Sequence, residues 1–141
     1  MKIDLKLRRC SNLDYRQDYL SNTMDLQKEL QTIIDKHDIH CDVKVVNFGN
    51  CIEVRNYEGT EIWIRVTFVK NGLDLDFNVV QIEEDYRRNG IFTEIVNMVK
   101  TKNFVHKAFI SNVCTEEMIN FCKKHKFTFE KSINAFVICK R

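Results

Sequence analysis

Apolar and polar residues alternate at the start of the chain. From Lys2 to Arg8, aliphatic side chains fall on one side of an extended chain and charged side chains on the other, which predicts a half-buried strand. The spacing then changes to that of helices. A short helix is predicted over residues 12–20. A longer one is predicted from Ser21 or Thr23 to His37, because its apolar residues recur close to helical spacing.

Alternation returns at about Cys41 and predicts four successive strands, the last of which ends at Ile82. Pairs that contain glycine mark the turns between them, namely Gly49-Asn50, Glu58-Gly59 and Asn71-Gly72. Asn-Gly in particular is a strong signal for a hairpin. These strands are therefore expected to be joined by tight turns.

The last of these strands, residues 73–82, changes character along its length. Its odd-numbered residues from Leu73 to Val79 are apolar and predicted to point inward, whereas the residues between them are polar. Val80 and Ile82 then make the opposite face apolar as well. Such a strand is expected to be open on one face at its start and covered on both faces at its end, with helices over only part of the sheet.

The remaining segments predict alternating helices and strands. A helix is expected from Ile91 to Val99, a strand over residues 108–113, a helix capped by Thr115, and strands over residues 127–129 and 135–139. The order β-α-α-β-β-β-β-α-β-α-β-β contains no linker, repeat or low-complexity segment. It predicts one α/β (α+β) domain that spans residues 1–141.

Composition and charge argue against two classes of partner, nucleic acids and membranes. The chain is 44% hydrophobic and 30% charged, and its formal net charge is only +2, so nothing global favours nucleic acid or a membrane. No stretch approaches the roughly 20 apolar residues of a membrane helix. The N-terminus also lacks the continuous apolar run of a signal peptide. The expectation is a cytoplasmic protein with neither a membrane nor a nucleic acid as its partner.

The 6 cysteines are expected to be reduced thiols, because a chain of 141 residues without an export signal does not need disulfides. Cys114, Cys122 and His125 lie close in sequence, but no CxxC pair accompanies them. A structural zinc site normally shows paired ligands at short spacing, so no metal is expected.

The segment from Glu84 to Val96, EDYRRNGIFTEIV, carries the clearest candidate site. It leads from a strand into a helix, and the first backbone N–H groups of a helix have no partner within it. Gly90 permits a close approach to the backbone, and Arg87 and Arg88 supply positive charge. Either the glycine only eases the turn, or the turn binds an anionic ligand such as a phosphate.

In this context the chain resembles the GNAT superfamily of acyl-CoA-dependent N-acyltransferases. Ile82 to Phe92, IEEDYRRNGIF, is similar to the family's strand-turn-helix segment, and Arg87 and Gly90 match its R-x-x-G signature. Phe92 replaces the final glycine or alanine of that signature. The segments LKLRRCSNLDY and TEEMINFCKKHKF look like the family's first strand and its late helix.

The resemblance implies a mixed, mostly antiparallel central sheet, splayed at the cofactor site and flanked by helices. It implies acetyl-CoA as the co-substrate, with the pantetheine arm along the backbone from Ile82 to Glu84 and the pyrophosphate on the amides of Arg87 to Phe92. The implied cofactor-binding residues are Ile82, Glu84, Arg87, Arg88, Asn89, Gly90, Ile91 and Phe92.

The implied reaction transfers an acetyl group to a primary amine of a small molecule or a protein. It needs a group that removes a proton from the amine and a group that protonates the leaving thiolate. Glu83 and Glu84, at the strand end, are candidate bases or solvated turn residues. Cys122 occupies the position of the family's tyrosine, and it is either the proton donor or a small buried apolar residue.

A second hypothesis is a catalytically inactive GNAT-fold protein that binds a partner protein, with or without CoA. Phe92 in the loop and the missing tyrosine favour this hypothesis, whereas Arg87 and Gly90 favour the enzyme. The apolar final strand, AFVIC, would also permit a homodimer. The sequence does not identify the amine acceptor.

Overall fold

The computed structural model describes residues 20–56, 61–69, 74–87 and 89–139 of the chain. The strand predicted for residues 2–8 lies outside them, as does all but the last residue of the helix predicted over residues 12–20. Arg88 and the turns predicted at Glu58-Gly59 and Asn71-Gly72 also lie outside the described residues.

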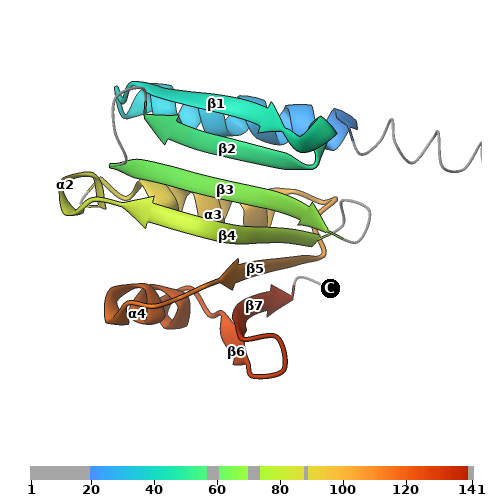
Figure 1. Cartoon of the computed structure of the whole chain (residues 1–141), viewed down its shortest axis with the longest axis vertical. Helices are drawn as coiled ribbons and strands as arrows, with labels where there is room; N and C mark the ends of the chain where they lie inside the picture. The colour runs from blue at the N-terminus through green and yellow to red at the C-terminus, as the bar shows by residue number, and fades with distance from the viewer. Residues whose placement is uncertain (1–19, 57–60, 70–73, 88, 140–141) are drawn as a thin grey trace, which may run out of the picture.

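One sheet organises the described residues (Figure 1). Its strands are β1 (Cys41–Val46), β2 (Cys51–Asn56), β3 (Ile62–Val69), β4 (Asp74–Ile82), β5 (Lys107–Ser111), β6 (Thr128–Glu130) and β7 (Ala135–Cys139), in the spatial order β1-β2-β3-β4-β5-β7-β6. Only β4 and β5 pair parallel, and the other neighbours pair antiparallel. The predicted class, an α/β (α+β) fold with a mixed and mostly antiparallel sheet, is confirmed.

The helices are α2 (Glu84–Arg87), α3 (Ile91–Thr101), α4 (Glu116–Lys124) and an N-terminal helix whose described part covers residues 20–36. The long helix predicted from Ser21 or Thr23 to His37 is thus confirmed, although Leu20 is already helical and the last helical residue is Lys36. A short 3-10 helix, η1 (Asn47–Gly49), forms the turn between β1 and β2. α2 is a single helical turn where only a turn leading into α3 was predicted.

The N-terminal helix and α3 lie side by side behind the sheet in Figure 1. At the C-terminal end of α3, Lys102 Nζ lies 2.8 Å from Asp25 Oδ2 and 3.0 Å from Glu29 Oε1. At its N-terminal end, His37 Nε2 lies 2.8 Å from Glu94 Oε1. Because the early residues of one helix meet the late residues of the other, the two helices run antiparallel. Their apolar sides and the sheet enclose the core.

A β-bulge in β4 corrects one prediction. Phe77 lies opposite Val66, but Arg65, which precedes Val66 in β3, lies opposite Val79, so Asn78 is an extra residue in β4. The bulge reverses the alternation that follows it. Val80 and Ile82 consequently lie opposite the fully buried Ile64 and Ile62, on the same face as Leu75 and Phe77. The prediction that they make the opposite face apolar is therefore wrong, since the bulge keeps one apolar face throughout.

A candidate ligand-binding cleft

β4 and β5 separate along their length. They pair only where Asp74–Phe77 faces Lys107–Ile110, and β4 then continues to Ile82 with β3 as its partner. At the point of separation, Asn112 Nδ2 donates a hydrogen bond of 3.1 Å to the backbone carbonyl of Asn78. Beyond it, the edge of β4 that faced β5 borders an opening.

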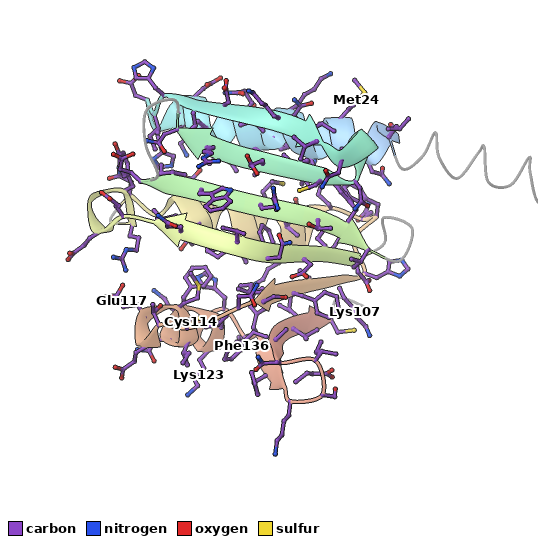
Figure 2. The ribbon with its side chains drawn as sticks, viewed as in Figure 1. Met24, Lys107, Cys114, Glu117, Lys123 and Phe136 are labelled. Carbon is purple, nitrogen blue, oxygen red and sulfur yellow. The ribbon has the colours of Figure 1, made fainter. Side chains whose placement is uncertain are left out.

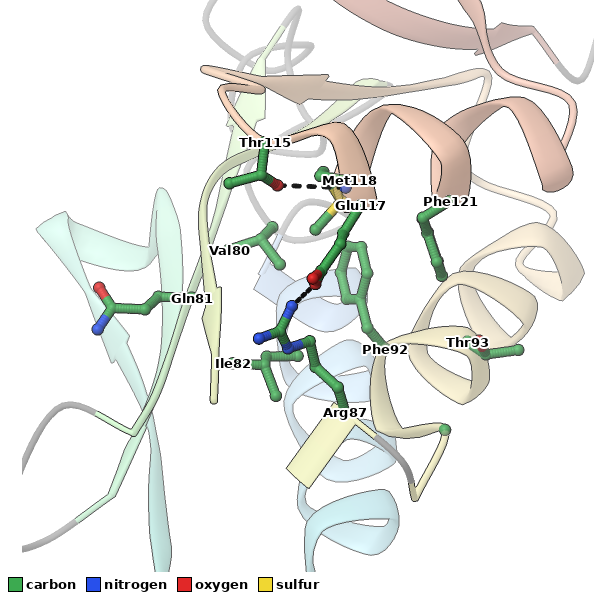
Figure 3. Close-up of a pocket in the computed structure, with 11 residues that line it drawn as sticks. Val80, Gln81, Ile82, Arg87, Phe92, Thr93, Thr115, Glu117, Met118 and Phe121 are labelled. Atoms are coloured by element: carbon green, nitrogen blue, oxygen red, sulfur yellow. Dashed lines mark hydrogen bonds and ion pairs between the residues drawn. The ribbon is translucent and has the colours of Figure 1, made fainter. Parts of the chain in front are cut away.

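This opening is a cleft of about 320 Å³, within the size range of small-molecule sites (Figure 3). It lies between the end of β4, the start of α3 and the start of α4. Its lining residues are Val80, Gln81, Ile82, Arg87, Gly90, Phe92, Thr93, Thr115, Glu117, Met118 and Phe121.

The start of α3 borders the cleft without a side-chain cap. Gly90 is its N-cap, with φ 70° and ψ 25°, and no side chain caps the helix. A Cβ atom built on Gly90 meets no heavy atom within 4 Å. The left-handed φ explains why glycine is favoured in this turn. The first amides of a helix have no partner within it, so an uncapped helix start with free space beside its N-cap is suited to an anion.

The start of α4 is capped by the side chain of Thr115. Thr115 Oγ1 accepts a hydrogen bond of 3.2 Å from the Met118 amide, as a helix N-cap does. Glu116 and Glu117 occupy the first turn, where negative charge is favourable against the helix dipole. Figure 2 shows Glu117 on the side of α4 that faces α2, and Lys123 on the opposite side.

An ion pair joins these two regions across the cleft. Arg87 Nη1, at the end of α2, contacts Glu117 Oε2 in the first turn of α4 (Figure 3). The side chain of Arg87 is 43% exposed and that of Glu117 is 72% exposed. Arg87 therefore borders the cleft, and a carboxylate of the protein takes up part of the hydrogen-bonding capacity of its guanidinium.

Phe92 forms part of the inner wall rather than filling the loop. Its side chain is only 6% exposed. Its ring packs edge-on to Phe77, with centroids 5.4 Å apart, and lies 5.0 Å from the ring of Phe121. The bulk that departs from the family signature is thus directed into the core, and it links α3 to α4. The turn around Gly90 keeps its open backbone.

The structure places the predicted cofactor-binding residues in three environments. Ile82, Arg87, Gly90 and Phe92 line the cleft together. Ile91 is fully buried, so it can offer a ligand only its backbone. Glu84 and Asn89 are exposed and are not part of the lining. Their binding roles remain predictions.

The predicted catalytic residues do not meet in the cleft. Glu83 and Glu84 are exposed at the start of α2 and lie outside the lining. Cys122 is fully buried, and burial raises the pKa of its thiol to about 11. Burial and nearby lysines also lower the pKa of His125, in the same part of the chain. The roles remain predictions, and the burial of Cys122 counts against its role as a proton donor.

Sequence reasoning missed the contribution of α4 to the cleft. Thr115 and Glu117 were recognised only as helix-start residues, and Met118 and Phe121 only as part of a helix. Nothing in their spacing indicates that they would face the end of β4. Their position depends on the separation of β4 from β5, which is a tertiary feature.

No described helix is long and apolar enough to cross a bilayer. Among the residues that the structure describes, no group of three or more His, Cys, Asp and Glu side chains is arranged to hold a metal ion.

No protein-family model matches the chain, and no curated protein matches it. Among solved structures, the chain is similar to YhhK from E. coli, a candidate N-acetyltransferase whose solution structure was determined bound to coenzyme A. The TM-score is 0.48 and the sequence identity is 19%, with 63% of this chain and 70% of that chain covered.

Proposed function

We propose that the chain is an N-acyltransferase of the GNAT type that binds acetyl-CoA in the cleft between β4 and α4. One observation carries the proposal: the open strand edge of β4, the uncapped start of α3 and the cation of Arg87 all border the same cleft. Such a combination suits a ligand that has both an amide-bearing chain and a pyrophosphate.

Each part of the cleft suits one part of the ligand. The amides of Ile91 to Thr93 would donate hydrogen bonds to the pyrophosphate oxygens, with Arg87 beside them. The edge of β4 near Ile82 would pair with the amides of the pantetheine arm, as an added strand would. The side chains of Met118 and Phe121 would cover the apolar parts of that arm.

The proposed reaction is direct transfer. The nitrogen of a primary amine attacks the thioester carbonyl carbon, the C–S bond breaks, and an amide forms. The amine loses a proton and the departing thiolate gains one. The cleft's main contribution would be to hold the two reactants in contact.

A second candidate, a GNAT-type module that binds CoA or a partner protein without transfer, is favoured by the composition of the lining. In the described part of the chain, the ionisable lining residues are Arg87 and Glu117, and they are paired with each other. The thiol of Cys122 lies in the core. The described lining therefore holds no group suited to protonating a thiolate near neutral pH.

Thermal unfolding with increasing acetyl-CoA tests the cofactor. A ligand of the native state raises the free energy of unfolding, by about 2.7 kcal/mol at a hundredfold excess over Kd. We expect the midpoint to rise with ligand concentration. A midpoint that does not move up to millimolar acetyl-CoA would contradict the transferase and the CoA-binding form of the module, and it would leave a module that binds only a partner protein.

Release of free thiol from acetyl-CoA, measured with a panel of primary amines, then separates the enzyme from the binding module. We expect amine-dependent release. A protein that is stabilised by acetyl-CoA but releases no thiol with any amine acts as a binding module under these conditions, and the transferase proposal then fails.

A further inference from the structure

Arg87 and Glu117 form an ion pair across the cleft. Both side chains line the cleft, and they come from α2 and α4, on opposite sides of it. Negative charge is favourable throughout the first turn of α4, and Glu116 supplies it as well. Of these two glutamates, only Glu117 belongs to the lining.

We propose that Glu117 competes with anionic ligands for Arg87. An anionic ligand must displace the Glu117 carboxylate before it can bind the Arg87 guanidinium. Among the described lining residues, Arg87 is the cation, and the Glu117 carboxylate occupies part of the hydrogen-bonding capacity of its guanidinium. A pyrophosphate held on the start of α3 would compete with Glu117 for the guanidinium N–H groups of Arg87. This inference rests on the proposed function and adds a residue that sets the affinity for the charged part of the ligand.

The exchange is physically feasible because the pair is exposed. With 43% of Arg87 and 72% of Glu117 accessible, water screens their attraction, and such pairs are weak. Glu117 can turn outward into solvent without leaving a buried charge behind. If it stayed beside Arg87, its carboxylate would repel the phosphate groups.

The ion pair also connects α2 to α4 over the cleft. Displacement of Glu117 would release this connection when a ligand binds, and loss of the ligand would restore it. The competition depends on charge alone. It therefore lowers the affinity for ligands that carry phosphate groups and leaves the affinity for uncharged ligands unchanged.

Calorimetric titration with two probes tests the competition. CoA carries the pyrophosphate, whereas pantetheine is uncharged and shares only the arm. At low ionic strength, Glu117→Gln is expected to bind CoA about three- to fivefold more tightly than the wild type, the upper part of the range that an exposed ion pair can contribute. Its affinity for pantetheine is expected to be unchanged.

Glu116→Gln is the matched control. It removes the same charge from the same helical turn but is not part of the cleft lining. We expect less than a twofold effect on CoA binding. Raising the salt concentration is expected to reduce the advantage of Glu117→Gln, since salt screens exposed charges.

Three results would overturn the inference while leaving the proposed function intact: equal CoA affinities for Glu117→Gln and Glu116→Gln, weaker CoA binding by Glu117→Gln, or an equal gain for pantetheine. Failure of both the wild type and Glu117→Gln to bind CoA overturns the proposed function, and the inference fails with it. Binding of CoA by Glu117→Gln alone supports the competition.

Discussion

Helices α3 and α4 begin at the same cleft but are built in opposite ways. α3 starts at Gly90 without a side-chain cap, and five of its residues are buried, whereas α4 starts at the Thr115 cap and buries only Cys122. When a side-chain oxygen already accepts a hydrogen bond from one of the first amides of a helix, fewer amide donors remain for an anion. The difference indicates that α3 is the more firmly packed side of the cleft and α4 its more loosely packed wall.

The difference in burial is expected to give the largest effect. Ile95 in α3 is fully buried, whereas Ile119 in α4 is only partly buried. Truncation of a buried isoleucine to alanine typically costs about 2–5 kcal/mol, so we expect about 3 kcal/mol for Ile95→Ala and about half of that for Ile119→Ala. Urea unfolding measures both. Equal losses would show that α4 is anchored as firmly as α3.

The open start of α3 is tested by a pair of substitutions at Gly90. Gly90→Asp and Gly90→Asn have the same shape and both strain the left-handed backbone, which asparagine and aspartate tolerate better than most residues. Only aspartate places a negative charge where the phosphate would bind. We expect CoA affinity to fall about a hundredfold for Gly90→Asp and less than tenfold for Gly90→Asn.

Calorimetric titration of both variants with CoA supplies this measurement. Similar losses for the two variants would assign the effect to backbone strain instead of charge. Undiminished binding by Gly90→Asp would show that the start of α3 is not the anion site.

Attachment of α4 to the core can be followed through its buried thiol. Burial raises the pKa of Cys122 from 9.0 to about 11, so at pH 8 it carries much less of the reactive thiolate than an unshifted thiol does. In native protein we expect iodoacetamide to label Cys122 at least tenfold more slowly than the exposed Cys114. The rate at Cys122 should rise with pH until about pH 11.

Peptide mapping by mass spectrometry distinguishes the two cysteines, and protein unfolded in urea provides the control, in which both should react at similar rates. Labelling of Cys122 as fast as Cys114 in native protein would show that α4 often separates from α3.

The cap of α4 is expected to give the smallest effect. Thr115→Ala removes the hydroxyl that accepts from the Met118 amide, and loss of such a cap costs about 1 kcal/mol. Thr115→Ser keeps the hydroxyl and should retain most of the stability. Thermal unfolding compares the two variants. If serine is as destabilising as alanine, the methyl group of Thr115, and not its hydrogen bond, stabilises the start of α4.

The same contrast explains which features could be predicted from the sequence. The periodicity of residues 21–37 and 91–99 indicated the N-terminal helix and α3, because each has a long apolar side that must face the sheet. α2 was missed because a single turn is too short to show a period. In β4, the change of phase at Asn78 was visible, but a bulge and a strand covered on both faces give the same pattern.

For the site, the sequence by itself determined the chemistry of one side. Gly90 and Arg87 precede a helix, and the free amides of a helix start follow from local backbone geometry alone. Only the tertiary structure decided the other side. Glu117, Met118 and Phe121 reach the cleft because β4 leaves β5 and α4 packs beside the opening. The pairing of Glu117 with Arg87 depends on that packing, because contacts between segments far apart in sequence are set by how whole elements pack together.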